Sequence, residues 1–224
     1  MSLKYIGPAS AHKKKAVILL HGAGANRHDL APLSNFLDPN KNFDWYFPEA
    51  PVNINPMFNM HVWFPVEEVI SLLADPKTNP EDVANYLPQG IDEARLALSN
   101  FLNLILGSYE SVIIGGFSQG SMMSADYFFH QASDKIKALL LFSGTSIDHS
   151  GWLKNMAAIK KIPIYQSHGR EDSVLPFRFG EVLHQFLKQQ AFPVEFHAFM
   201  GGHELPEEVL RSARHFLHKH LGHH

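Results

Sequence analysis

Short apolar runs rich in β-branched and aromatic residues alternate with helical patterns along most of the chain. Several runs are apolar at every position, as expected of parallel strands buried on both faces. We predict strands at residues 16–20, 44–47, 111–117, 138–142, 162–165 and 194–199. Helical patterns lie near 29–37, 90–106, 119–131, 180–190 and 206–221. This alternation predicts an α/β protein with a mostly parallel, doubly wound sheet and helices on both faces.

The length of 224 residues fits a single domain, because one sheet with helices on both faces commonly takes about 200–250 residues. The net charge is −3, with acidic and basic residues mixed throughout, so we expect no nucleic-acid partner. No run reaches the ~18 apolar residues of a membrane helix, and the start lacks a signal-peptide pattern. We therefore expect a cytoplasmic protein with no integral membrane segment.

The chain contains no cysteine, which excludes a disulfide framework, a thiolate zinc site and a cysteine nucleophile. A serine takes the place of that nucleophile in Gly116-Phe117-Ser118-Gln119-Gly120, which matches the pattern G-x-S-x-G. The motif joins a predicted strand to a predicted helix, and its glycines let the two approach at a sharp turn that exposes the serine. This arrangement predicts an enzyme that attacks acyl groups with Ser118.

A serine nucleophile needs a general base to take its proton and an acid to orient that base. We assign the base to His203, which follows the predicted strand 194–199, and the acid to Asp172, which follows the predicted strand 162–165. The resulting chain order of serine, acid and histidine is the order found in α/β-hydrolases.

Other residues compete for these two roles. His21 and His168 are alternative bases, although each directly precedes a glycine at a strand end, a position better suited to shaping a turn. Glu171 and Asp148 are alternative acids, and in that case Asp172 would cap a helix. The sequence favours His203 and Asp172 without eliminating these four residues.

Attack on an acyl carbon creates an oxyanion, which two backbone N–H groups usually stabilise. One donor follows the nucleophile and the other comes from the loop after an early strand, which nominates Gln119 and Ala23. Gly22 and Gly24 would let that loop turn tightly beneath the substrate. A phosphate-binding loop is the weaker interpretation, because the glycine spacing fits neither the dinucleotide nor the Walker pattern.

Five motifs occur together and in order: Leu20-His21-Gly22, Trp63-Phe64, Gly116-Phe117-Ser118-Gln119-Gly120, His168-Gly169 with Asp172, and Gly202-His203. With them the chain resembles the phospholipase/carboxylesterase family, which includes bacterial carboxylesterases and acyl-protein thioesterases, over residues 16–217. The resemblance implies a cofactor-free serine hydrolase with a small α/β-hydrolase fold and no large cap domain. It also implies that Ser118, Asp172 and His203 form the catalytic triad.

The segment 51–88 is rich in proline and asparagine and has no clear strand pattern, so we expect an excursion that covers the site. The resemblance implies that Met60, Trp63 and Phe64 border an acyl groove. The alternative is that Trp63 and Phe64 are core residues. The chain departs from the thioesterase branch at 23–26, where Ala-Gly-Ala-Asn replaces the Leu-Gly-Asp form.

The carboxyl terminus is rich in histidine, and His215 and His218 share a predicted helix face. No carboxylate or cysteine accompanies them, so we interpret the segment as a basic helix end and expect no metal site. Residues 222–224 read as a possible tag remnant.

These observations predict a carboxylesterase that acts on a small-molecule ester or acyl substrate and needs no cofactor. An acyl-protein thioesterase or a lysophospholipase is the alternative enzyme, because the same three residues serve either reaction. A ligand-binding protein on a hydrolase scaffold is the non-enzymatic alternative. Exposed apolar residues in such folds also serve as dimer interfaces, which makes a homodimer an open expectation.

Overall fold

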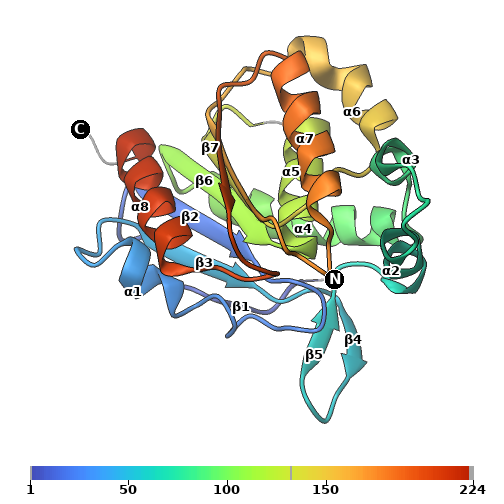
Figure 1. Ribbon diagram of the computed structural model, residues 1–224. Coiled ribbons are helices and arrows are strands. Elements are labelled where there is room, and N and C mark those ends of the chain that lie inside the picture. The colour runs from blue at the N-terminus through green and yellow to red at the C-terminus, as the bar shows by residue number, and fades with distance from the viewer. Residues whose placement is uncertain (1, 132, 222–224) are drawn as a thin grey trace.

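The computed structural model describes residues 2–131 and 133–221, and a seven-stranded sheet forms the centre of this part of the chain (Figure 1). Across the sheet the strands are β1 (Tyr5–Ile6), β3 (Asp44–Pro48), β2 (Lys15–Leu20), β6 (Ser111–Phe117), β7 (Ile136–Phe142), β8 (Ile164–Gly169) and β9 (Val194–Phe199). The edge strand β1 pairs antiparallel with β3, and the other pairs are parallel. The mostly parallel sheet predicted from the sequence is therefore confirmed.

Helices cover both faces of this sheet (Figure 1). On one face lie α1 (Leu33–Leu37) and α8 (Glu207–Leu221), and on the other lie α4 (Ile91–Leu106), α5 (Gln119–Gln131) and α7 (Phe177–Gln189). Successive strand residues point to opposite faces, so Val17 and Leu19 pack toward α1 and α8 while Ile18 and Leu20 pack toward the other helices. Because both faces are covered, the strands are apolar at nearly every position.

The direction of winding reverses between β2 and β6, which are hydrogen-bonded neighbours at the centre of the sheet. From β2 the chain moves outward to β3, whereas from β6 it moves the other way through β7, β8 and β9. The loops that follow β2 and β6 therefore separate and open a crevice at the carboxyl ends of these strands, where ligands bind in such sheets.

Several boundaries differ from the sequence prediction, including the start of β7, which lies at Ile136 instead of 138. The helical pattern from residue 29 is wrong at its start, because α1 begins at Leu33, after Pro32, whose missing N–H suits a helix start. Strand β8 begins at Ile164, after Pro163, and runs on to Gly169 instead of ending at residue 165. The helix predicted from residue 180 begins at Phe177, again directly after a proline.

The segment 51–88 contains more regular structure than predicted. A two-stranded hairpin, β4 (Val52–Asn55) and β5 (Met60–Val62), corrects the expectation that no strand occurs there. Strand β4 is solvent-exposed on most residues, so it lacks the apolar run from which the other strands were predicted. The short helices α2 (Glu67–Ala74) and α3 (Pro80–Asn85) follow.

Helix α6 (His149–Asn155) and a short 3₁₀ turn at Met156–Ala158 connect β7 to β8, and neither was predicted. Asp148 begins α6 by accepting a hydrogen bond from the N–H of Gly151. None of the helices in the ranges described is long and apolar enough to cross a bilayer.

Candidate active site

Ser118 lies at the turn between β6 and α5, at the carboxyl edge of the sheet. Its φ of 54° is left-handed, a conformation that a serine holds only when its surroundings impose it. Gly116 and Gly120 make so tight a turn possible, because a Cβ atom at either position would collide with the carbonyl oxygen of Leu20. The strand, the turn and the helix therefore close tightly around Leu20 and present the Ser118 side chain outward.

His203 and Asp172 form a hydrogen-bonded pair, with 2.7 Å between Nδ1 of His203 and Oδ2 of Asp172. The second oxygen, Oδ1, accepts the backbone N–H groups of Val174 and Leu175 at 2.9 and 2.7 Å. Burial by itself would raise the pKa of Asp172, but the hydrogen bonds from His203 and Leu175 outweigh it and hold that pKa below its ordinary value. A carboxylate so held is an anion at neutral pH and fixes the orientation of the imidazole.

The two alternative histidines lie beneath the site. Nε2 of His21 accepts the N–H of Ala50 at 3.0 Å, so its proton is on Nδ1, which donates to the carbonyl of Gly22 at 2.8 Å. Nε2 of His168 lies 2.8 Å from the carbonyl of Leu175 and therefore donates to it. Burial lowers the pKa of both rings. Both histidines brace the loops that carry other site residues.

The two alternative acids lie elsewhere. Glu171 is exposed, and its backbone N–H binds the loop that carries His203 through the carbonyl of Gly201. Asp148 belongs to a group with Asp126 and His130 whose ligand atoms lie within 4.8 Å of one another. The guanidinium of Arg95 donates to all three residues at 2.7–2.9 Å. The positive charge among these three side chains is therefore that of Arg95.

Ala23 and Gln119 flank Ser118, and both line the cavity that holds it. Within residues 2–131 and 133–221, neither backbone N–H has a hydrogen-bond partner. The loop of Ala23 is held at the next residue, since Gly24 donates to the carbonyl of His61 at 2.8 Å and its φ of 78° suits glycine. Two unengaged N–H groups therefore lie beside the serine.

The side chain of Gln119 has a role that the sequence analysis missed. Its Oε1 accepts the backbone N–H of Trp63 and its Nε2 donates to the carbonyl of Phe64, both at 2.8 Å. The residue is 2 % exposed, so these bonds form away from water. We call this pair of bonds the Gln119 clamp, because it ties the chain after β5 to the start of α5.

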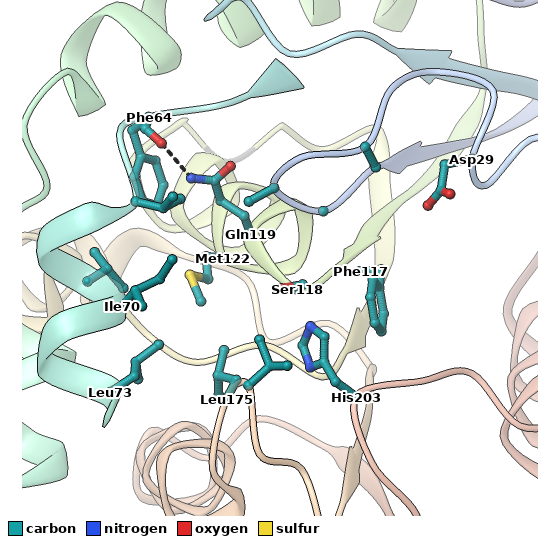
Figure 2. A pocket seen from close by; sticks show the side chains of 16 residues that line it. Asp29, Phe64, Ile70, Leu73, Phe117, Ser118, Gln119, Met122, Leu175 and His203 are labelled. Carbon is teal, nitrogen blue, oxygen red and sulfur yellow. Dashed lines mark hydrogen bonds between the residues drawn. The ribbon is translucent and has the colours of Figure 1, made fainter. Parts of the chain in front are cut away.

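A cavity of about 250 Å³ opens in front of Ser118 (Figure 2). Apart from Ser118, Gln119, Asp29 and His203, its walls are apolar or glycine: Gly22, Ala23, Ala25, Phe64, Val66, Val69, Ile70, Leu73, Phe117, Met122, Val174 and Leu175. Figure 2 shows Ile70, Leu73 and Met122 on one side of Ser118 and Phe117 with Asp29 on the other. His203 lies between the two sides, next to Ser118.

The three residues expected to border a groove lie in different places. Phe64 lines the cavity. Trp63 is fully buried and donates from its indole N–H to the carbonyl of His21 at 3.0 Å. Met60 is half-buried, packs against Gly24 and is not among the lining residues described. Helix α2, which the sequence analysis missed, supplies much of the wall through apolar residues at helical spacing, a detectable signal.

His215 and His218 lie on α8, on the sheet face that α1 also covers. Nε2 of His218 lies 3.0 Å from the carbonyl of Leu37, and therefore binds α8 to the end of α1. The possible tag remnant at 222–224 lies outside the described residues.

Known proteins resemble this chain over nearly its whole length. Residues 2–221 match the Phospholipase/Carboxylesterase family. An acyl-protein thioesterase 1 of Candida albicans is 30 % identical over 219 residues, which cover 91 % of each chain. A probable carboxylesterase of Oryza sativa subsp. japonica is 27 % identical over 230 residues, 95 % of this chain and 80 % of the rice protein.

Solved structures share the fold. The crystal structure of esterase PE8 has a TM-score of 0.75 and 28 % identity, with 98 % of this chain and 99 % of that chain covered. The Bacillus cereus carboxylesterase has a TM-score of 0.70 at 20 % identity, covering 98 % and 95 % of the two chains. The expected α/β-hydrolase fold is confirmed, and between β5 and α4 the described chain holds only α2 and α3, far less than a large cap domain.

Proposed function

The chain belongs to the phospholipase/carboxylesterase family of hydrolases, and we propose that it hydrolyses carboxylic esters through an acyl-enzyme on Ser118. The observation that carries the proposal is the 2.7 Å bond between His203 and Asp172 beside a serine in the left-handed conformation, with both His203 and Ser118 lining one cavity. Nucleophile, base and orienting acid come from three loops at one edge of the sheet, as hydrolysis by a serine requires.

In the first half of the reaction, Nε2 of His203 takes the proton of the Ser118 hydroxyl as its oxygen bonds to the acyl carbon. The carbonyl oxygen becomes an oxyanion between the N–H groups of Ala23 and Gln119, which have no other partner in the described chain. When the intermediate collapses, the bond from carbon to the leaving oxygen breaks, and His203 gives its proton to that oxygen. Alcohol leaves, and the acyl group stays on Ser118.

In the second half, water takes the place of the alcohol. His203 removes a proton from the water as its oxygen bonds to the acyl carbon, and the second oxyanion forms between the same N–H groups. Its collapse breaks the bond to Ser118, which recovers its proton from His203, and the carboxylic acid leaves. Asp172 keeps the Nδ1 proton in place in both halves, and His21 holds the carbonyl of Gly22 so that the Ala23 N–H keeps its direction.

The test is hydrolysis of p-nitrophenyl esters from acetate to palmitate by the wild type and by Ser118→Ala. We expect turnover by the wild type and a loss of several orders of magnitude in the variant, with unchanged thermal unfolding. Near-wild-type turnover by the variant would overturn the role of Ser118. A folded wild type that hydrolyses no ester and is not labelled by a fluorophosphonate would favour the ligand-binding alternative.

Thioester hydrolysis is the second candidate function. It is favoured by the similarity to proteins named acyl-protein thioesterase 1 and by the exposed apolar side chains of Ile70 and Val174 at the cavity mouth. Comparing kcat/KM for an oxygen ester and a thioester with the same acyl chain decides between the two. A thioester preference that grows with chain length would support the thioesterase.

A further inference from the structure

The mostly apolar cavity in front of Ser118 is lined by one carboxylate, that of Asp29. Of the residues described as lining it, Asp29 and His203 alone are ionisable. The Asp29 side chain is exposed and has no hydrogen bond or ion pair to any other described residue, although its backbone N–H binds the carbonyl of Asn26. Its neighbour Arg27 is bound to Glu49 at 2.8 Å. The negative charge of Asp29 is therefore free to act on a bound molecule.

The position of Asp29 in the cavity places it near the leaving group of the substrate rather than near the acyl chain. The acyl chain requires apolar surroundings, which Leu73, Ile70 and Met122 provide on one side of Ser118 (Figure 2). The leaving group must lie within reach of His203, which protonates it. Asp29 and Phe117 line the cavity on the other side of Ser118 from these apolar residues, and the Phe117 ring lies against that of His203 (Figure 2). The alcohol part of the ester therefore departs past a carboxylate and an aromatic ring.

These two side chains suit a cation. A carboxylate attracts an ammonium group, and a benzyl ring attracts the same group through its π-face while packing on its alkyl carbons. The Phe117 ring is half-buried and its centroid lies 4.7 Å from that of His203, so a group held against it stays close to the base. A sulfonate or phosphate on the alcohol would instead be repelled by Asp29.

We propose that Asp29 and Phe117 form a leaving-group subsite that selects esters of cationic, ammonium-bearing alcohols over esters of anionic alcohols. The inference rests on the proposed hydrolysis at Ser118 and names the substrate class of that same site. Asp29 acts here as a specificity residue and takes no part in bond making or breaking.

The experiment compares three butyrate esters whose alcohols carry a positive, no or a negative charge. They are the choline ester, its carbon isostere with a tert-butyl group in place of trimethylammonium, and the ester of isethionate, a sulfonate. Release of butyric acid is followed in a pH-stat for the wild type, for Asp29→Asn and for Asp82→Asn. Asp82 is an exposed acid on α3 and is not among the residues that line the cavity. Asp82→Asn changes the net charge of the protein by the same amount as Asp29→Asn, so it controls for net charge alone.

For the wild type we expect kcat/KM to fall in the order choline, isostere, isethionate, with about 3–10-fold between the first and the last at low salt. Asp29→Asn should abolish most of this ratio, and Asp82→Asn should keep it. Raising the ionic strength from about 0.01 M to about 1 M should also reduce the wild-type ratio, because the Debye length falls from about 30 Å to about 3 Å.

Two results would overturn the subsite: equal ratios in the wild type and in Asp29→Asn, or hydrolysis of p-nitrophenyl butyrate without hydrolysis of the choline ester. Both leave the proposed function intact. If the wild type hydrolysed none of the esters, p-nitrophenyl butyrate included, the proposed function itself would be overturned.

Discussion

Acidification should destabilise the protein through His149, which lies at the first turn of α6. The residue is 5 % exposed, and its ring stacks on that of Phe186 with 3.9 Å between centroids. Burial lowers the pKa of His149 from 6.5 to about 4, although nearby Asp148 acts in the opposite direction. The helix N-terminus further disfavours a positive charge at this position. The folded protein therefore holds His149 neutral under conditions in which the unfolded chain protonates it.

The sign and size of the effect follow from this difference. Below pH 6.5 the unfolded state binds more protons than the folded state, so stability that is present above pH 6.5 is lost as the pH falls toward about 4. Between about pH 7.5 and about pH 5, His149 should remove about 2 kcal/mol from the free energy of unfolding. That loss is a large fraction of the ~5–15 kcal/mol that stabilises a typical domain.

Urea unfolding, followed by tryptophan fluorescence at both pH values, measures this loss for the wild type and for His149→Phe. The phenylalanine keeps a flat ring against Phe186 and does not titrate, so the variant should lose about 2 kcal/mol less than the wild type on acidification. Other buried histidines titrate in both proteins and cancel in the difference. His149→Leu serves as a second non-titrating variant if the first does not fold. Equal losses in the wild type and a folded variant would refute the reasoning.

Three further changes test the site. Asp172→Asn should lower kcat by about 10³–10⁴-fold with unchanged thermal unfolding, because an amide would turn the His203 imidazole to the wrong tautomer; p-nitrophenyl ester kinetics measure it. Gly120→Ala should destabilise the fold by about 3 kcal/mol, since the methyl group meets the Leu20 carbonyl, and an unchanged urea midpoint would contradict this. Met122→Phe should shorten the preferred acyl chain by filling the cavity, as read from kcat/KM across a chain-length series.

The sequence predicted the sheet and the serine turn because their signals are local. Buried parallel strands are apolar throughout, and the turn at Ser118 has glycines at fixed offsets between a strand and a helix. Placing Asp172 and His203 near each other needed one further rule, that parallel strands end at the same edge. The structure brings the two side chains together because β8 and β9 are neighbours in the sheet.

What the sequence did not reveal depends on contacts between distant residues. The Gln119 clamp joins residues that are 55 and 56 positions apart, and a glutamine after the serine gives no sign of this. Asp29 lies in a loop after β2 and enters the cavity only because of how that loop folds back. Strand β4 was missed because it is exposed, and exposed strands lack the apolar pattern that marks buried ones.

The Gln119 clamp also bears on how readily the protein can be re-engineered. It anchors the chain at Trp63 and Phe64 from inside the domain, and α4 anchors the chain again from Ile91. The stretch between these anchors has two fixed ends, and we expect its composition to vary without moving Ser118 where its core residues Val69, Leu73 and Val83 are kept. Exchanging residues 66–89 among relatives would then transfer acyl-chain preference as a unit, with the turnover machinery left in place.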